Sequence, residues 1–206
     1  YGGLDHALAS GKNINILVLD TEVYSNTGGQ SSKATPTAAS AKFASAGKKG
    51  GKKDLAMQAV SYGNVYVARI AFGANPQQTM LAMREAEAYD GPSLIFAYSH
   101  CIAYGYNLKD GLTQQKNAVD SAYWPLMRYN PVLRKKKQNP FILDSTRPSI
   151  PLKTFAYKEL RYKMLTQTNP VEAEELMVLA QEMVNLRWKN YEELATKTAS
   201  DFVPIA

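Results

Sequence analysis

One polar segment of this sequence has the composition of a cation- or phosphate-binding loop. Residues 20–37 read DTEVYSNTGGQSSKATPT and directly follow the apolar run INILVLD. Magnesium prefers oxygen ligands and usually shares them with substrate phosphates, and residues 21–26 offer a Thr hydroxyl, backbone carbonyls and an Asn amide. Gly28 and Gly29 let the backbone approach a ligand closely or adopt a positive φ. The alternative is a polar turn that binds no ligand and is held by its own side-chain hydrogen bonds.

The single cysteine of the chain is the second candidate for chemistry. Cys101 follows the apolar run SLIFAYS at residues 93–99. Taken alone, a cysteine at the end of a strand is most often a small buried hydrophobic residue. One cysteine excludes an intrachain disulfide and is typical of a protein from the reducing cytoplasm.

The elements that must position both candidates follow from the alternation of apolar runs with helical patterns. We predict strands at 14–20, 65–71 and 93–99, and helices that end near Gly11 or span 36–46, 54–62, 75–89 and 113–123. Alternating strands and helices indicate an α/β fold with a mostly parallel sheet flanked by helices. We read 14–20 as a buried parallel strand. Open sheets of this kind bind ligands at the carboxyl ends of their strands, which is where both candidates lie.

The C-terminal quarter of the chain has a different pattern. After a possible edge strand at 126–129, two amphipathic helices at 152–165 and 170–195 follow without any strand between them. We therefore predict an α/β domain at 1–150 and a C-terminal helical extension at 151–206. The extension would pack on the sheet or on a partner subunit.

Composition narrows the classes of partner. The formal charge of +6 comes partly from GKKGGKK, with Lys48, Lys49, Lys52 and Lys53, and from RKKK at 134–137. We interpret these clusters as solvated loops. The alternative is that they steer an acidic partner. Both are short and neither interleaves aromatic residues, so the composition does not favour nucleic acid. No apolar run approaches the roughly 20 residues that span a membrane.

The polar segment and its surroundings also resemble a known family. TEVYSNTGGQSSKATP, with YGGLDH before it and YSHCIAYG after it, resembles the pyruvate:ferredoxin (flavodoxin) oxidoreductases. The similarity is to their C-terminal thiamine-diphosphate-binding domain. It covers residues 1–162 and is loose after residue 166. It includes GKKDLAMQAVSYGNVYVA, GPSLIFAYSHCI, SAYWPLMRYNP and NPFILDS.

The resemblance implies a role for particular residues. The diphosphate-bound Mg²⁺ would be held by the Thr21 side chain, the Val23 main-chain carbonyl and an aspartate of an upstream Gly-Asp-Gly element. Asn26 would face the thiazolium ring and the substrate. Cys101 would be the fourth cysteine ligand of a 4Fe–4S cluster. The residues expected to line the cofactor are Thr21, Glu22, Val23, Tyr24, Ser25 and Asn26.

The resemblance also implies an activity. It is the oxidative decarboxylation of pyruvate to acetyl-CoA and CO₂, with coenzyme A as acceptor and electrons passed through iron–sulfur clusters to ferredoxin or flavodoxin. The Gly-Asp-Gly element and three further cysteines are not in this sequence. We therefore expect a fragment, inactive alone, that works with the remaining domains of the same polypeptide in a homo-oligomer. The alternatives are a relative acting on another 2-oxo acid and a non-catalytic interaction domain of the same fold.

Overall fold

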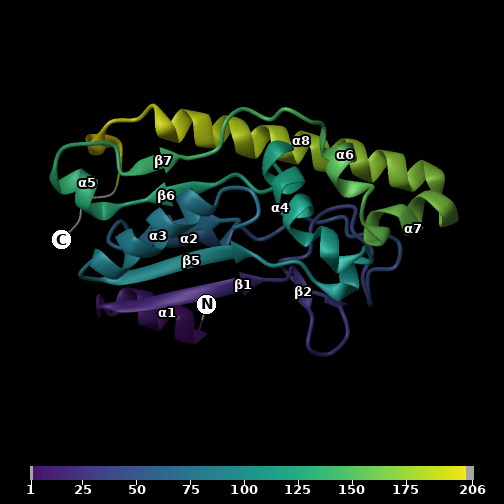
Figure 1. The fold of residues 1–206 in the computed structure, drawn as a ribbon, viewed down its shortest axis with the longest axis horizontal. Coiled ribbons are helices and arrows are strands. Elements are labelled where there is room, and N and C mark those ends of the chain that lie inside the picture. Colours follow the sequence, from purple (N-terminus) through teal and green to yellow (C-terminus); the bar gives the residue numbers. More distant parts are fainter. Residues whose placement is uncertain (1, 203–206) are drawn as a thin grey trace.

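A computed structural model describes residues 2–202 and centres on a five-stranded sheet between helices (Figure 1). The strands lie in the order β1 (Ile14–Asp20), β5 (Pro92–Tyr98), β4 (Tyr66–Ile70), β6 (Met127–Tyr129) and β7 (Phe141–Leu143). The pairs β1–β5 and β5–β4 are parallel, and β6 and β7 are added antiparallel. The α/β fold with a mostly parallel sheet flanked by helices is therefore confirmed.

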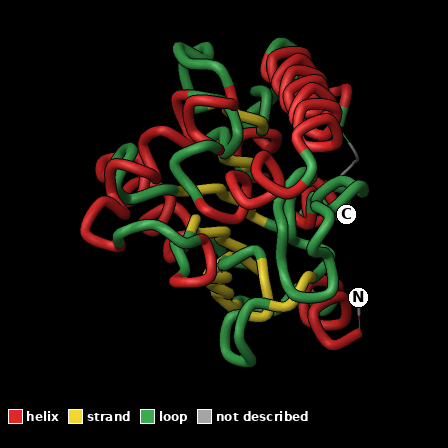
Figure 2. The backbone as a smooth tube through the Cα atoms, turned by 90° about the vertical axis from the view of Figure 1, so that its right-hand side faces the viewer, coloured by secondary structure: helices red, strands yellow, loops and turns green. Residues whose placement is uncertain are grey.

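Both faces of the central strands are apolar because helices cover both. Val65 and Val67 of the segment around β4 belong to one hydrophobic cluster, whereas Tyr66 and Ala68 belong to a second. Residues of α3 (Pro76–Ala88) complete the second cluster. Most of the other helices pack into the first cluster, and α8 (Pro170–Ala195) runs along the side of the sheet nearest β7 (Figures 1 and 2).

The helix boundaries follow their capping residues. Asn75 caps α3 by accepting a hydrogen bond from the Gln78 N–H, and Asn169 caps α8 by accepting one from the Glu172 N–H. Such caps satisfy backbone donors that have no partner inside the helix. The remaining α-helices of the described residues are α1 (Gly2–Ala9), α2 (Leu55–Val60), α4 (Gly111–Asp120), α5 (Pro131–Lys135), α6 (Leu152–Ala156) and α7 (Leu160–Thr168).

The strand at 14–20 is parallel, as predicted, but it is not buried. β1 is an edge strand whose exposure alternates along its length. Ile16 and Val18 contact the main cluster, while the side chains of Leu17 and Leu19 are 50% and 64% exposed. A fully apolar run does not reveal on its own whether both faces of a strand are covered.

The predicted helix at 36–46 is wrong. This segment forms turns and isolated bridges, and Ala38 and Phe43 adopt positive φ angles of 70° and 68°. Its backbone groups pair with distant segments: the Ser40 N–H donates to Arg161 O, and the Lys42 N–H donates to Gly29 O. These tertiary hydrogen bonds replace the local ones that a helix would form.

The C-terminal half differs from the prediction in two places. The strand at 126–129 is β6 and is not at the edge, because β7, which we did not predict, pairs outside it. The helix at 152–165 is two helices, α6 and α7, separated by a turn that ends at Glu159. The helix at 170–195 is confirmed as α8. Residues of α6, α7 and α8 share the main hydrophobic cluster with the sheet, and the division into domains at residue 150 stays a prediction.

Candidate functional site

The register of β1 and β5 places both candidate segments at the same edge of the sheet. Asp20 pairs with Tyr98, and the Ser99 N–H donates to Asp20 O at 3.2 Å. The loop after β1 and the turn after β5 therefore leave the sheet side by side. Farther along, Gly29 lies so close to the Cys101 turn that a Cβ added to it would stand 3.0 Å from the Ala103 Cβ.

The loop after β1 brings two oxygen atoms together. The Thr21 Oγ1 donates a hydrogen bond to Val23 O at 3.2 Å and lies 3.4 Å from the Ser25 Oγ. Neighbouring ligands of an octahedral magnesium ion, at bond lengths of 2.0–2.1 Å, are about 2.9 Å apart. The hydroxyl of Thr21 and the carbonyl of Val23 thus have a separation that fits two adjacent ligands of one magnesium ion.

This convergence depends on the conformation of Glu22, which lies between the two oxygen-bearing residues. Glu22 has a φ of 60°, in the left-handed region that residues other than glycine rarely adopt. Its backbone is fixed on both sides: its N–H donates to Asp20 Oδ1 at 3.0 Å, and its carbonyl accepts from Thr35 Oγ1 at 2.7 Å. Such a conformation persists only where the surroundings over-determine it.

The Glu22 side chain is 1% exposed and points into a buried ionic cluster. Its carboxylate accepts a 2.5 Å hydrogen bond from Tyr123 Oη, and it lies 3.3 Å from Lys52 Nζ and 2.9 Å from Arg161 Nη1. Burial would raise the pKa of Glu22, but the two cations and the hydroxyl hold it below its ordinary value. The side chain therefore anchors the loop from the inside, and its predicted place against the cofactor stays a prediction.

The rest of the predicted cofactor segment forms an exposed hairpin. β2 (Val23–Tyr24) and β3 (Gln30–Ser31) pair antiparallel, and Gly28 and Gly29 take φ angles of 105° and 88° in the turn between them. Tyr24, Ser25 and Asn26 are exposed along this hairpin. Tyr24, Ser25 and Asn26 thus lie on the accessible side of the loop, unlike the buried Glu22.

Cys101 begins the turn that follows β5. Cys101 is buried, with 7% of the residue exposed, and its Sγ accepts from the Ala103 N–H at 3.4 Å. The turn continues as a short helix at Ile102–Tyr104, ending at Gly105 with a φ of 73°. The position is compatible both with a packed thiol and with a thiolate ligand, and the predicted role of Cys101 stays a prediction.

Four residues that the sequence did not single out for the site complete the ionic cluster. Lys52 Nζ lies 2.7 Å from Asp20 Oδ2, and Arg161 Nε donates to Glu159 Oε2 at 2.6 Å. Burial raises the pKa of Glu159, and the neighbouring Arg161 offsets only part of that effect. No sequence pattern marks this cluster, because it joins regions that are far apart in the chain. The residues missed are Lys52, Tyr123, Glu159 and Arg161.

The lysine cluster at 48–53 differs from the solvated loop that we predicted. Lys48 turns inward and donates to the carbonyls of Ser32 and Thr35 at 3.0 and 2.5 Å. Lys52 joins the ionic cluster. Lys49 is exposed and pairs with Glu172. Half of the apparent basic patch is therefore part of the loop's internal support.

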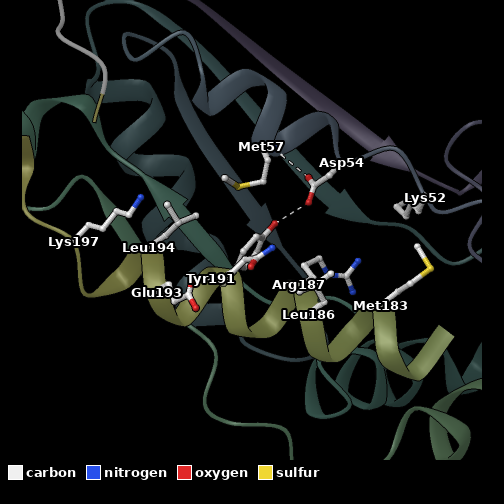
Figure 3. Close-up of a pocket in the computed structure, with 11 residues that line it drawn as sticks. Lys52, Asp54, Met57, Met183, Leu186, Arg187, Tyr191, Glu193, Leu194 and Lys197 are labelled. Carbon is white, nitrogen blue, oxygen red and sulfur yellow. Dashed lines mark hydrogen bonds between the residues drawn. The ribbon is translucent and has the colours of Figure 1, made fainter. Parts of the chain in front are cut away.

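A cavity of about 590 Å³ adjoins this support, between α8 and the segment before α2 (Figure 3). Lys52 lines it at one end, and the Tyr191 hydroxyl donates to Asp54 at 3.1 Å near its centre. Burial would raise the pKa of Asp54, but Arg69 and Arg187 hold it below its ordinary value. Asp54 also caps α2, so this contact joins α8 to the helix that follows the loop.

His, Cys, Asp and Glu side chains do not form a metal site by themselves in the part of the chain that the structure describes. Across residues 2–202, no group of three or more His, Cys, Asp or Glu side chains is arranged to hold a metal ion. A metal ion at Thr21 and Val23, or a cluster at Cys101, would need further ligands from outside residues 2–202.

Residues 2–202 contain no helix long and apolar enough to cross a membrane.

Comparison with known proteins identifies the family. Residues 1–97 match the family model of the thiamine pyrophosphate enzyme, C-terminal TPP binding domain. The chain is 60% identical to pyruvate-flavodoxin oxidoreductase of Trichormus variabilis, covering 96% of this chain and 17% of that protein. It is 54% identical to pyruvate:ferredoxin oxidoreductase of Moorella thermoacetica, covering 95% of this chain and 17% of that protein. The chain belongs to the pyruvate:ferredoxin (flavodoxin) oxidoreductase family.

The similarity to the pyruvate:ferredoxin (flavodoxin) oxidoreductases extends over nearly the whole chain. A third relative, pyruvate-flavodoxin oxidoreductase of a Nostoc species, is 55% identical over 197 residues. The chain spans about one sixth of the length of these relatives. Sequence similarity extends through 95–96% of the chain, so it includes the C-terminal helices that the resemblance matched only loosely.

Proposed function

We propose that the loop at 21–26 binds the magnesium–diphosphate group of thiamine diphosphate in a pyruvate:ferredoxin (flavodoxin) oxidoreductase. The observation that carries this proposal is the 3.2 Å separation of Thr21 Oγ1 and Val23 O on either side of the buried Glu22. The match of residues 1–97 to a TPP-binding domain supports the choice of cofactor. The relatives named as pyruvate oxidoreductases support the choice of substrate.

The residues of this chain would then have separate tasks. Thr21 and Val23 supply two oxygen ligands of the magnesium ion, and a carboxylate from the rest of the polypeptide supplies another. Asn26, exposed on the hairpin, orients the carbonyl of pyruvate by hydrogen bonding, since holding reactants in place lowers the entropic part of the barrier. Bound thiamine diphosphate supplies the electron sink for loss of carbon dioxide from the 2-oxo acid.

Cys101 would hold one iron of a 4Fe–4S cluster together with three cysteines from elsewhere in the polypeptide. The chain has no other cysteine, and a cluster of this type takes four thiolates. Such a cluster supplies one-electron transfer, here towards ferredoxin or flavodoxin. The close approach of Gly29 to Ala103 supports a short path between the loop after β1 and the Cys101 turn.

The proposal is tested with the full-length protein, assayed on several 2-oxo acids. We expect consumption of pyruvate that requires thiamine diphosphate, magnesium, coenzyme A and an oxidised ferredoxin or flavodoxin. A clear preference for a larger 2-oxo acid would contradict the choice of substrate. Absence of bound thiamine diphosphate would contradict the choice of cofactor and leave an interaction domain of the same fold.

A further inference from the structure

One buried side chain contacts both segments of the candidate site. Arg161 Nη1 lies 2.9 Å from the Glu22 carboxylate in the loop after β1. The same guanidinium stacks 3.7 Å from the centre of the Tyr104 ring, in the turn that Cys101 begins. Arg161 belongs to α7, more than 50 residues further along the chain.

The position of Arg161 is itself fixed. Its Nε donates to Glu159 Oε2 at 2.6 Å, and the other oxygen of Glu159 accepts from Gln114 Nε2 of α4 at 2.9 Å. The backbone carbonyl of Arg161 accepts from the Ser40 N–H at 2.7 Å. The side chain is 2% exposed, so it has neither the space nor the solvent to reorient.

The Tyr104 side of the contact leads directly to Cys101. The Tyr104 N–H donates to Cys101 O at 3.0 Å, and the Tyr104 hydroxyl donates to Ser99 O at 3.2 Å. These two hydrogen bonds close the turn around the cysteine. A shift of the Tyr104 ring would therefore move the backbone that carries the Cys101 thiol.

We propose that Arg161 is a positioning residue that fixes the loop after β1 (residues 21–26) and the Cys101 turn relative to each other. Arg161 thereby sets the affinity for magnesium and thiamine diphosphate and the environment of the Cys101-bound cluster. This inference rests on the proposed function. Its physical basis is that Glu22 holds a left-handed backbone between the two magnesium ligands, and Arg161 is one of the two cations that hold Glu22. The guanidinium lies over the Tyr104 ring, donates a hydrogen bond to Glu159 and forms an ion pair with Glu22, a combination that arginine provides and lysine does not.

The test uses the full-length holoenzyme with Arg161→Met and a matched control, Arg128→Met. Arg128 is also buried and pairs with two carboxylates, Glu85 at 2.7 Å and Asp144 at 2.8 Å, but it lies in β6 away from both loops. Affinities for magnesium and thiamine diphosphate are measured by titration of the cofactor-depleted protein. The clusters are followed by paramagnetic resonance of the reduced protein.

We expect Arg161→Met to weaken the affinity for magnesium and thiamine diphosphate by about 10- to 100-fold, the usual effect of losing a residue that orients a metal ligand. The resonance signal of one cluster should also shift, while Arg128→Met should change neither property. Arg161→Lys, which keeps the charge, should fold and recover only part of the affinity. Unchanged affinity and an unchanged signal in either folded Arg161 variant would overturn the inference.

Thr21→Ala, measured in parallel, separates this inference from the proposed function. If Thr21→Ala weakens magnesium binding and the Arg161 variants do not, the positioning role is wrong and the proposed loop remains. If Thr21→Ala binds magnesium and thiamine diphosphate like the parent protein, the proposed function itself fails, and the positioning role fails with it.

Discussion

The hydroxyl of Thr21 and the carbonyl of Val23 lie 3.2 Å apart at the carboxyl end of β1. They converge because the residue between them is held in a left-handed conformation by contacts inside the protein. The loop is therefore shaped from the core outward. The positions of these two oxygen atoms therefore depend on buried residues behind the loop, Tyr123 and Arg161.

The first prediction concerns Cys101. If its thiolate holds a cluster iron, Cys101→Ser and Cys101→Ala in the full-length protein should each lose or destabilise one 4Fe–4S cluster and keep the others. Serine's oxygen is a harder donor than a thiolate and a poor substitute for it. Delivery of electrons to ferredoxin should fall sharply. Iron analysis and paramagnetic resonance of the reduced protein measure the outcome.

The other interpretation of Cys101 makes a different prediction for the same variants. If Cys101 is a packed thiol, either substitution should lower the unfolding free energy by about 0.5–3 kcal/mol, the usual range for point mutants, and leave the iron content unchanged. A full set of unaltered clusters in both variants would make Cys101 a core residue.

The second prediction separates two neighbouring lysines of one basic cluster. Lys52→Met removes the cation between Asp20 and Glu22, and it should lower the unfolding free energy by about 2–4 kcal/mol, because buried carboxylates lose their partner. Lys49→Met removes an exposed pair with Glu172 and should leave stability unchanged. Urea unfolding followed by the fluorescence of Trp124 and Trp188, both buried, reports both. Equal effects would mean that the ionic cluster contributes no more than a surface pair.

The third prediction is a pH dependence at Asp54. Arg69 and Arg187 hold the pKa of Asp54 below its ordinary value despite burial. The charged form therefore contributes stability that is fully present above about pH 4, the ordinary pKa of an aspartate, and is lost as the pH falls through the lowered value. Asp54→Asn should be less stable than the parent at pH 6, with the difference shrinking below about pH 4. A difference that stays constant from pH 6 to pH 3 would contradict the assignment.

The sequence predicted the parts of this fold that depend on local signals. The strand–helix alternation, the Asn75 cap and the whole of α8 are where their patterns place them. The helix predicted at 36–46 does not form because backbone groups of this segment bond to Gly29, Lys48 and Arg161, and its remaining local hydrogen bonds are those of turns and an isolated bridge. The single helix predicted at 152–165 is interrupted for a related reason. Glu159 turns into the core, where it bonds to Arg161 and Gln114.

The sequence predicted the residues of the candidate site that stand in the loop after β1 and after β5, but not the buried ionic cluster behind them. Thr21, Val23 and Asn26 stand in one short run of sequence, and Cys101 follows a recognisable strand. The cluster that supports them joins Asp20, Glu22, Lys52, Glu159 and Arg161 from three separate regions of the chain. These charges come together only in the folded protein, so no local sequence pattern predicts the cluster.

The most direct test of the account is the affinity of the full-length protein for magnesium in the presence of thiamine diphosphate, compared among the parent, Thr21→Ala and Thr21→Ser. Thr21→Ala removes one ligand oxygen and should weaken magnesium binding by at least about tenfold, while Thr21→Ser keeps that oxygen and should bind almost as the parent does. The titration starts from protein depleted of both metal and cofactor. Equal affinities in all three proteins would show that Thr21 only shapes a turn, and would contradict the account.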